Sequence, residues 1–419
     1  MEETIHMARP KKLHTLIAET LASEAENAAR QVLANAVLAR LAEQGVPVEG
    51  FPIDDFVDRL KSGRDMDGFA WPEGTPDTDL SVAFTAEEEA AMNEEVDRLV
   101  STGKDREAFA ELMELSARTV LKEVMKSFRE FKADDDADLY GFRQRLDLRW
   151  GKALDLYRLL LSISQELLSE MTTALRRSKA KRHWQLRDAM LGIHARALRT
   201  GRAVLVLLQP GMADEAYARW RTLYELSVVA SFISEHGDEA AAMYRAHEVV
   251  SNKARIDNSI EWDEPLGTEE QRTDITGDYE HLVQKYGASF ESPYGWASPF
   301  LEGKQNPRFV DIELAIQGRR IAPPYKESSF QIHSGRAGLL GLGSLDESVI
   351  NTGHSNAGLE IPLMHSSLAV MQITTAALFQ NPARDFVVIK MLMLLDEKIH
   401  VEAKKAAQRL EKDHKKWDA

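Results

Sequence analysis

The chain of 419 residues contains no cysteine. Disulfide bridges, thiolate nucleophiles and cysteine-ligated zinc are therefore excluded, and the composition fits a reducing cytoplasm. No apolar run is long enough to span a bilayer, and the first residues, MEETIHMARPKKLH, lack the apolar core of a signal peptide. We therefore expect a cytoplasmic protein of bacterial type that has no membrane segment.

Positive charge is scarce as well, because 52 Lys and Arg stand against 67 Asp and Glu, which gives a net charge of −15. This balance disfavours a protein that coats nucleic acid or lies on an anionic membrane. One dense basic run remains, made of Arg176, Arg177, Lys179, Lys181 and Arg182. Such a run usually marks a solvated helix end, and the alternative is a patch that binds RNA phosphates.

Apolar residues recur at helical spacing through most of the chain, and no internal repeat of fixed period is present. The pattern predicts an all-α fold, a multi-helix bundle with a long loop-rich insertion and an N-terminal helical extension. We expect an N-terminal helical region with an acidic linker at 1–138, a central helical bundle at 139–262, a loop-rich insertion at 263–324, and C-terminal helices at 325–419 that complete the bundle. The acidic linker, residues 65–89, holds eight acidic residues and no basic one, and a capping box at Thr85–Glu88 begins the next helix.

Two charges, Arg221 and Glu225, lie among aromatic residues on a predicted helix whose opposite side is apolar. Residues four apart share a helix face, so the two side chains can satisfy each other. One interpretation is an ion pair that locks two helices, and the other is a pair that orients a ligand or a base. His247, on the next predicted helix, is close enough in the chain to contact Glu225 if the helices run antiparallel.

Further histidines lie in the C-terminal third. Ser329 and His333 are four residues apart beside a glycine-rich turn, without the strand–turn–helix context of a hydrolase nucleophile. His354 and His365 flank a segment with few carboxylates, and no metal-ligand spacing is present. We therefore expect neither a metal nor a cofactor.

The segments WGKALDLYRLLL and ARWRTLYE and the later run SSFQIHSG through LEIPLMHSSLAV carry a family resemblance. Over residues 149–381 the chain resembles the bacterial family catalogued as domain of unknown function 5677. The resemblance implies an all-helical bundle, and it assigns no catalytic role to any residue.

The chain is also similar, over a shorter motif, to the helical HEPN ribonucleases, whose site is an Arg and a His on one helix with four to six residues between them. Arg187 and His194 fit this spacing, and they lie beside the basic run. The similarity implies metal-independent RNA cleavage with His194 as acid or base and Arg187 on the phosphate.

Two functions follow from these observations, and the sequence leaves open whether the protein is an enzyme. The first is a HEPN-like ribonuclease or toxin-type effector in phage defence, with RNA as partner. The second is a non-enzymatic ligand-sensing or protein-interaction module built on the Arg221/Glu225 helix. A homo-oligomer or a protein partner would be contacted through residues 263–324. Convergence of His194 with Arg187 at an open cleft would favour the first function, and burial of both would favour the second.

Overall fold

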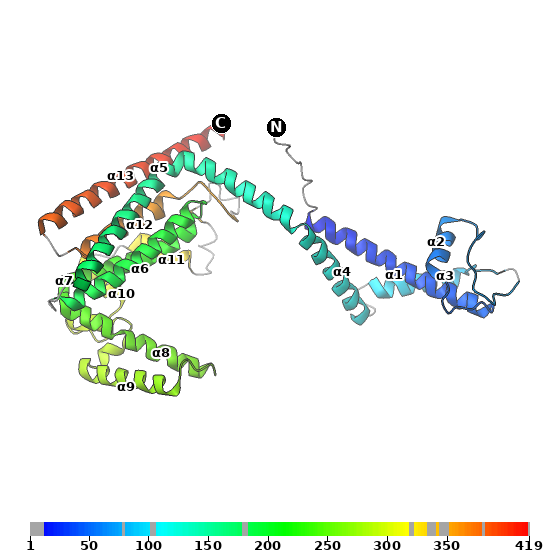
Figure 1. Ribbon diagram of the computed structural model, residues 1–419, viewed down its shortest axis with the longest axis horizontal. Helices are drawn as coiled ribbons and strands as arrows, with labels where there is room; N and C mark the ends of the chain where they lie inside the picture. Colours follow the sequence, from blue (N-terminus) through cyan, green and yellow to red (C-terminus); the bar gives the residue numbers. More distant parts are fainter. Residues whose placement is uncertain are drawn as a thin grey trace. The chain divides into compact units, whose positions relative to one another are not determined.

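The computed structural model describes residues 12–77, 80–100, 106–177, 183–317, 322–332, 341–342, 352–378 and 382–417 (Figure 1). Every regular element in these ranges is a helix, which confirms the predicted all-α multi-helix fold. The helices form because apolar residues recur every three or four positions and bury one stripe against a neighbouring helix.

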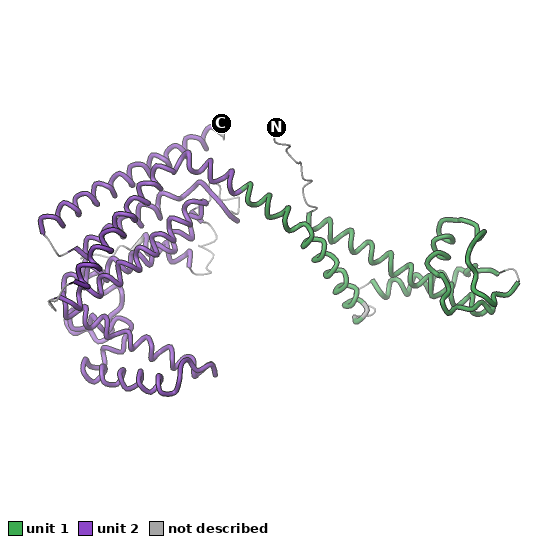
Figure 2. Tube along the Cα trace, viewed as in Figure 1, with its two compact units in different colours: residues 1–138 green, residues 139–419 purple. Residues whose placement is uncertain are grey.

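The chain divides into two compact units, residues 1–138 and 139–419 (Figure 2). The first unit contains the helices α1 (Leu13–Glu43), α2 (Ile53–Ser62), α3 (Ala86–Val100), α4 (Arg106–Lys126) and the start of α5 (Phe128–Arg177). The remaining helices of the second unit are α6 (Trp184–Leu208), α7 (Ala213–Ala246), α8 (Glu248–Glu261), α9 (Glu269–Tyr286), α10 (Phe309–Gln317), α11 (Ala322–Phe330), α12 (Glu360–Ala376) and α13 (Pro382–Trp417). Two short 3-10 helices, η1 (Ala288–Glu291) and η2 (Gly295–Phe300), lie between α9 and α10.

The first unit has a small aromatic core. Its rings belong to Phe51, Phe56, Phe69 and Trp71, and their centroids lie 5.0 to 6.1 Å apart. Phe69 and Trp71 come from the segment that the sequence predicts to be an acidic linker. Their side chains pack on α1 and α2, because burying the rings offsets the entropy of ordering this part of the segment.

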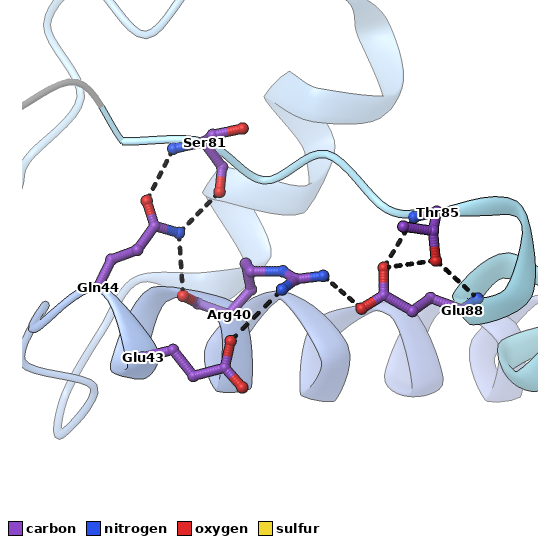
Figure 3. Close-up of polar contacts among 6 residues, drawn as sticks. All are labelled: Arg40, Glu43, Gln44, Ser81, Thr85 and Glu88. Atoms are coloured by element: carbon purple, nitrogen blue, oxygen red, sulfur yellow. Dashed lines mark hydrogen bonds and ion pairs between the residues drawn. The ribbon is translucent and has the colours of Figure 1, made fainter.

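The start of α3 is held by the predicted capping box (Figure 3). The Glu88 amide donates to Thr85 Oγ1 at 3.3 Å, and the Thr85 amide donates to Glu88 Oε2 at 2.7 Å. Arg40 of α1 donates to the other oxygen of Glu88, and Gln44 bonds both the carbonyl and the amide of Ser81. These contacts tie the end of α1 to the beginning of α3 and fix the path of the intervening loop.

The core of the second unit is built around α7, which contacts α6, α10, α11, α12 and η2. Its largest fully buried side chains include Trp150, Tyr157, Tyr217 and Phe232. Gly201 lets α6 approach α5 closely, because a Cβ there would lie 2.8 Å from Leu161 Cδ2, and its carbonyl accepts from Tyr157 Oη at 3.2 Å.

A sharp bend divides α7 at Gly237, where φ is 74° and ψ is −149°. This backbone conformation is accessible almost only to glycine, because a Cβ would clash with the main chain. The bend places the two halves of α7 on different sides of the cleft described below.

Residues 263–324, which the sequence predicts to be a loop-rich insertion, contain more helix than expected. This segment includes α9, η1, η2 and α10 among its loops. α9 begins with a capping box in which Thr268 Oγ1 accepts from the Gln271 amide at 3.2 Å. Its apolar periodicity is weak because no residue of α9 is fully buried, which is why the hydrophobic pattern does not reveal it.

Candidate functional site

A polar network joins α7 to α11. Arg221 Nε donates to Glu225 Oε1 at 3.1 Å, Nη1 donates to Ser329 Oγ at 3.0 Å, and Nη2 donates to Tyr325 Oη at 2.9 Å. The Tyr325 hydroxyl in turn donates to Glu225 Oε1 at 2.6 Å. One carboxylate oxygen thus accepts from both a guanidinium and a phenol, so the Glu225 side chain is held in one position.

Aromatic rings surround this network. The Arg221 guanidinium carbon lies 4.6 Å from the centroid of the Tyr325 ring, and Tyr325 stacks on Phe309 with centroids 5.4 Å apart. Tyr224 donates to Glu313 Oε1 at 2.5 Å and packs 5.6 Å from Tyr325. The network is only partly buried, because the side chains of Arg221 and Glu225 are 25% and 33% exposed.

Glu225 opens onto a cleft of about 740 Å³ in the second unit. α6, both halves of α7, the start of α8 and the loop before η2 form its walls. The lining residues are Asp188, Ala189, Gly192, Ile193, Arg196, Thr222, Glu225, Leu226, Val229, Tyr244, Arg245, His247, Glu248, Ser251, Pro293, Tyr294 and Trp296. A cleft of this volume is large enough to enclose a small organic molecule.

One wall of the cleft is aromatic. Tyr244 and Trp296 meet edge to face, with centroids 5.1 Å apart and planes at 79°. Burial, together with the nearby Glu225, raises the pKa of Tyr294 to about 12. Burial also raises the pKa of Tyr244. Both phenols are therefore neutral at pH 7, where they can donate hydrogen bonds.

The rim of the cleft carries charges of both signs. Arg245 is paired with Asp188 at 2.9 Å, and its guanidinium carbon lies 4.6 Å from the centroid of the Trp184 ring. Arg196 and Glu248 are exposed, and neither forms an ion pair within the part of the chain that the structure describes. These two groups are accessible to a ligand, whereas Arg245 and Asp188 satisfy each other.

His247 lies at the edge of the cleft and is not bonded to Glu225. It is 7% exposed, and its Nε2 lies 2.9 Å from the Ser292 carbonyl, so this nitrogen carries the proton and donates. Burial lowers the pKa of His247. The neutral imidazole therefore fastens the end of α7 to the loop before η2.

His194 faces the core of the second unit and is fully buried. Its Nε2 lies 3.1 Å from Thr374 Oγ1, which also contacts Ser164 Oγ at 3.1 Å. Burial lowers the pKa of His194 to about 4. A catalytic role for His194 does not fit this structure, because RNA cannot reach a group that α12 covers completely.

Arg187 and the basic run do not complete an RNA site among the described residues. Arg187 Nε is buried without a hydrogen-bond partner in that part of the chain. Arg176 and Arg177 are exposed in the last turn of α5, and Arg177 shares a surface hollow with Glu166, Glu170 and Asp385, which would repel a phosphate. The other predicted members of the patch, Lys179, Lys181 and Arg182, lie outside the described residues.

The remaining predicted site residues are dispersed. Ser329 contacts Arg221, as described above, while His333 lies outside the described residues. His354 Nδ1 lies 2.7 Å from the Pro210 carbonyl, and His365 packs on Trp220 with centroids 4.8 Å apart. In the described ranges no three His, Asp or Glu side chains are grouped so that they could hold a metal.

A second polar cluster links α12 and α13. Ser367 donates to Asp396 Oδ1 at 2.5 Å, and His400 Nε2 lies 3.0 Å from the Met364 carbonyl and 3.5 Å from the same carboxylate oxygen. The serine hydroxyl faces the carboxylate and not the imidazole. Ser367 and Asp396 are both buried, so a substrate cannot reach the hydroxyl and the cluster links the two helices.

Sequence reasoning missed Tyr325, Tyr244 and Arg196. The segment SPYGWASPF was a usable signal for Tyr294 and Trp296, because these two aromatic residues lie between two prolines and a third, Phe300, follows directly. Nothing local marks Tyr325 as the partner of Glu225, since 100 residues separate them in the chain.

The structure thus defines an all-helical protein with a partly aromatic cleft beside a fixed carboxylate. A model described as "Family of unknown function (DUF5677)" matches residues 187–348. That range includes every residue that lines the cleft and the whole Arg221 network. The match supports the first resemblance found in the sequence and gives no support to the second.

Comparisons with curated proteins and with solved structures give no match. Among the described helices, none has a stretch apolar and long enough to cross a membrane.

Proposed function

We propose that this protein binds a small organic molecule in the cleft between α6, α7 and α8, as a ligand-binding module. The observation that carries this proposal is the state of Glu225. Hydrogen bonds from Arg221 and Tyr325 hold its carboxylate in one position, while a third of the side chain stays exposed. A preorganised charged group at the wall of a cleft costs little conformational entropy when it binds, which is the usual design of a recognition site.

The lining indicates the chemistry of the ligand. Tyr244 and Tyr294, which are half-buried, offer aromatic surface on which a flat ring can pack, and the buried Trp296 supports Tyr244. Glu225 accepts hydrogen bonds, so it selects for N–H or O–H donors on that ring. Thr222 and Ser251 add hydroxyl groups, while Arg196 and Glu248 can pair with charged substituents. We therefore expect a flat heterocycle that carries N–H donors, of the kind found in nucleobases and nucleosides.

Cleavage of RNA is not part of this proposal. Its only sequence basis is the spacing of Arg187 and His194, and the buried imidazole of His194 makes that chemistry inaccessible. Of the two functions weighed from the sequence, burial of His194 counts against the first, while Arg187 is only half-buried.

Thermal-shift measurements on the full chain test the proposal. The probes are free nucleobases and nucleosides, and each hit is confirmed by titration calorimetry. We expect at least one probe to raise the melting temperature of the wild type. Glu225→Gln, which keeps the shape and loses the charge, should weaken binding of that probe about tenfold or more, since a hydrogen bond to a charged group contributes about 1.5–3 kcal/mol.

Glu235→Gln is the matched control, because this exposed carboxylate lies on the same helix outside the cleft. It should leave binding unchanged. The proposal fails if no probe binds the wild type, or if every probe that binds is held equally well by Glu225→Gln.

A further inference from the structure

α13 carries two apolar stripes, and only one of them is covered. The inner stripe, which packs on α12, consists of Leu392, Leu395, Ile399, Ala403 and Ala406, all buried. The outer stripe consists of Val387, Met391, Leu394 and Val401, which are 66%, 42%, 59% and 43% exposed. α13 also forms ion pairs with α5 through Asp413, Glu402 and Arg384. A helix that packs along one side is normally polar on its other face, so the outer stripe needs an explanation.

The spacing of the outer stripe is that of a coiled-coil seam. Val387, Met391 and Leu394 are separated by four and then three residues, and Lys398 and Val401 continue the same alternation. Lys398 can occupy a seam position by laying its alkyl stem along the apolar partner and turning its ammonium to water. Figure 1 shows α13 at the outside of the second unit, where another helix can approach it.

Two charges beside the seam determine which partner fits. Lys390 and Glu397 are exposed, and within the described part of the chain neither has an ion-pair partner. They are seven residues apart, about 10 Å along the helix, which is too far for them to pair with each other. Each needs an opposite charge on the approaching helix.

We infer that the partner is a second copy of this chain, whose α13 lies antiparallel to the first about a two-fold axis between Met391 and Leu394. In this register Met391 faces Leu394 of the second copy, and Val387 faces the stem of its Lys398. Lys390 then lies opposite Glu397 of the second copy, and the two-fold symmetry repeats the pair. A parallel arrangement would set Lys390 against Leu395, which is already buried within its own chain, and Glu397 against Glu402, which has the same charge.

Light scattering coupled to size exclusion measures the mass of the full-length protein. The wild type should have the mass of two chains, and Leu394→Glu should have the mass of one. Val206→Glu is the control, because Val206 is an equally exposed apolar residue on α6, 63% exposed, away from this face. Circular dichroism shows whether each variant is folded, and changes at exposed positions should leave the helix content unaltered.

An exchange of charges tests the register. Lys390→Glu and Glu397→Lys should each shift the protein toward single chains, because each places like charges opposite one another twice. The double variant K390E/E397K should return the mass to two chains. A wild type with the mass of one chain at all concentrations, or a double variant that stays dissociated, overturns the inference.

The cysteine-free sequence allows a direct test of direction. In the antiparallel register the two copies of residue 391 lie about 5 Å apart along the axis, and those of residue 401 about 25 Å apart. A short bis-maleimide should therefore join two chains of Met391→Cys and leave Val401→Cys unjoined. Equal cross-linking of both variants would show a parallel pair and refute this arrangement.

Discussion

Tyr325 donates to the same oxygen of Glu225 that accepts from Arg221, and this shared atom joins two helices that lie 100 residues apart in the chain. Removal of any one member leaves the other two with unmatched groups. A third of the Glu225 side chain is exposed, so water can replace part of the hydrogen bonding that such a change removes. Its role is thus the positioning of one carboxylate more than the stability of the fold.

Glu225→Ala should lower the free energy of unfolding by about 1–2 kcal/mol, because two donors lose their acceptor in a partly hydrated site. A fully buried pair would cost about 3–5 kcal/mol. Urea denaturation at pH 7 distinguishes these values. Glu225→Gln should cost less than Glu225→Ala, since its amide oxygen still accepts, and an equal loss in both variants would contradict the geometry.

Tyr325→Phe removes the hydroxyl and keeps the ring that stacks on Phe309 and faces Arg221. We expect a loss of about 1 kcal/mol. Combined with Glu225→Gln, the loss should be smaller than the sum of the two single losses, because both changes disrupt one hydrogen bond. Additive losses in this double-mutant cycle would mean that the two groups do not interact in solution.

The buried imidazole of His194 should make stability depend on pH. Burial lowers its pKa to about 4, whereas in the unfolded chain it keeps its ordinary value of 6.5. As the pH falls below 6.5, the unfolded chain binds a proton that the folded chain excludes, so stability decreases until about pH 4. The contribution is about 3 kcal/mol over this range.

His194→Gln removes this contribution and leaves those of His247 and His365, whose pKa values burial also lowers. The measurement is the unfolding free energy between pH 7 and pH 4. The variant should show a smaller decrease than the wild type, and equal decreases would place His194 in contact with solvent.

Two glycines of α6 should respond in opposite directions to alanine. At Gly192 a Cβ would meet no atom within 4 Å, so Gly192→Ala should stabilise the protein by about 1 kcal/mol through helix propensity. At Gly201 a Cβ would lie 2.8 Å from Leu161 Cδ2 and 3.1 Å from Tyr157 Oη. Overpacking costs about 1–3 kcal/mol, which exceeds the gain in propensity. Thermal unfolding of the two variants should show shifts of opposite sign.

Most helices of this protein can be predicted from the sequence because their apolar residues recur at a helical period. The contact between Arg221 and Glu225 follows from their spacing on one helix turn. α9 was missed, since a helix with no fully buried residue has little apolar pattern to detect. The burial of His194 could not be foreseen either, because the residue that covers it, Thr374, lies 180 positions away.

The same limit explains why the cleft was not predicted. Its aromatic wall combines residues from α7 with Tyr294 and Trp296 from the loop before η2 and its start, and the pairing depends on how these elements pack. The segment at 263–324 was interpreted as an insertion with its own role. In the structure, Pro293, Tyr294 and Trp296 of this segment close one side of the cleft.

The bend at Gly237 has a consequence for how such a cleft can change. Thr222 and Val229 line it from the first half of α7, and Tyr244 and Arg245 line it from the second. The width of the cleft is therefore set by the backbone torsion angles of Gly237, which does not itself line the cleft. Substitution of a lining residue such as Ser251 can change which ligand fits while the cleft keeps its dimensions. Substitution of Gly237 would instead change the shape of the cleft, although residue 237 does not contact the ligand.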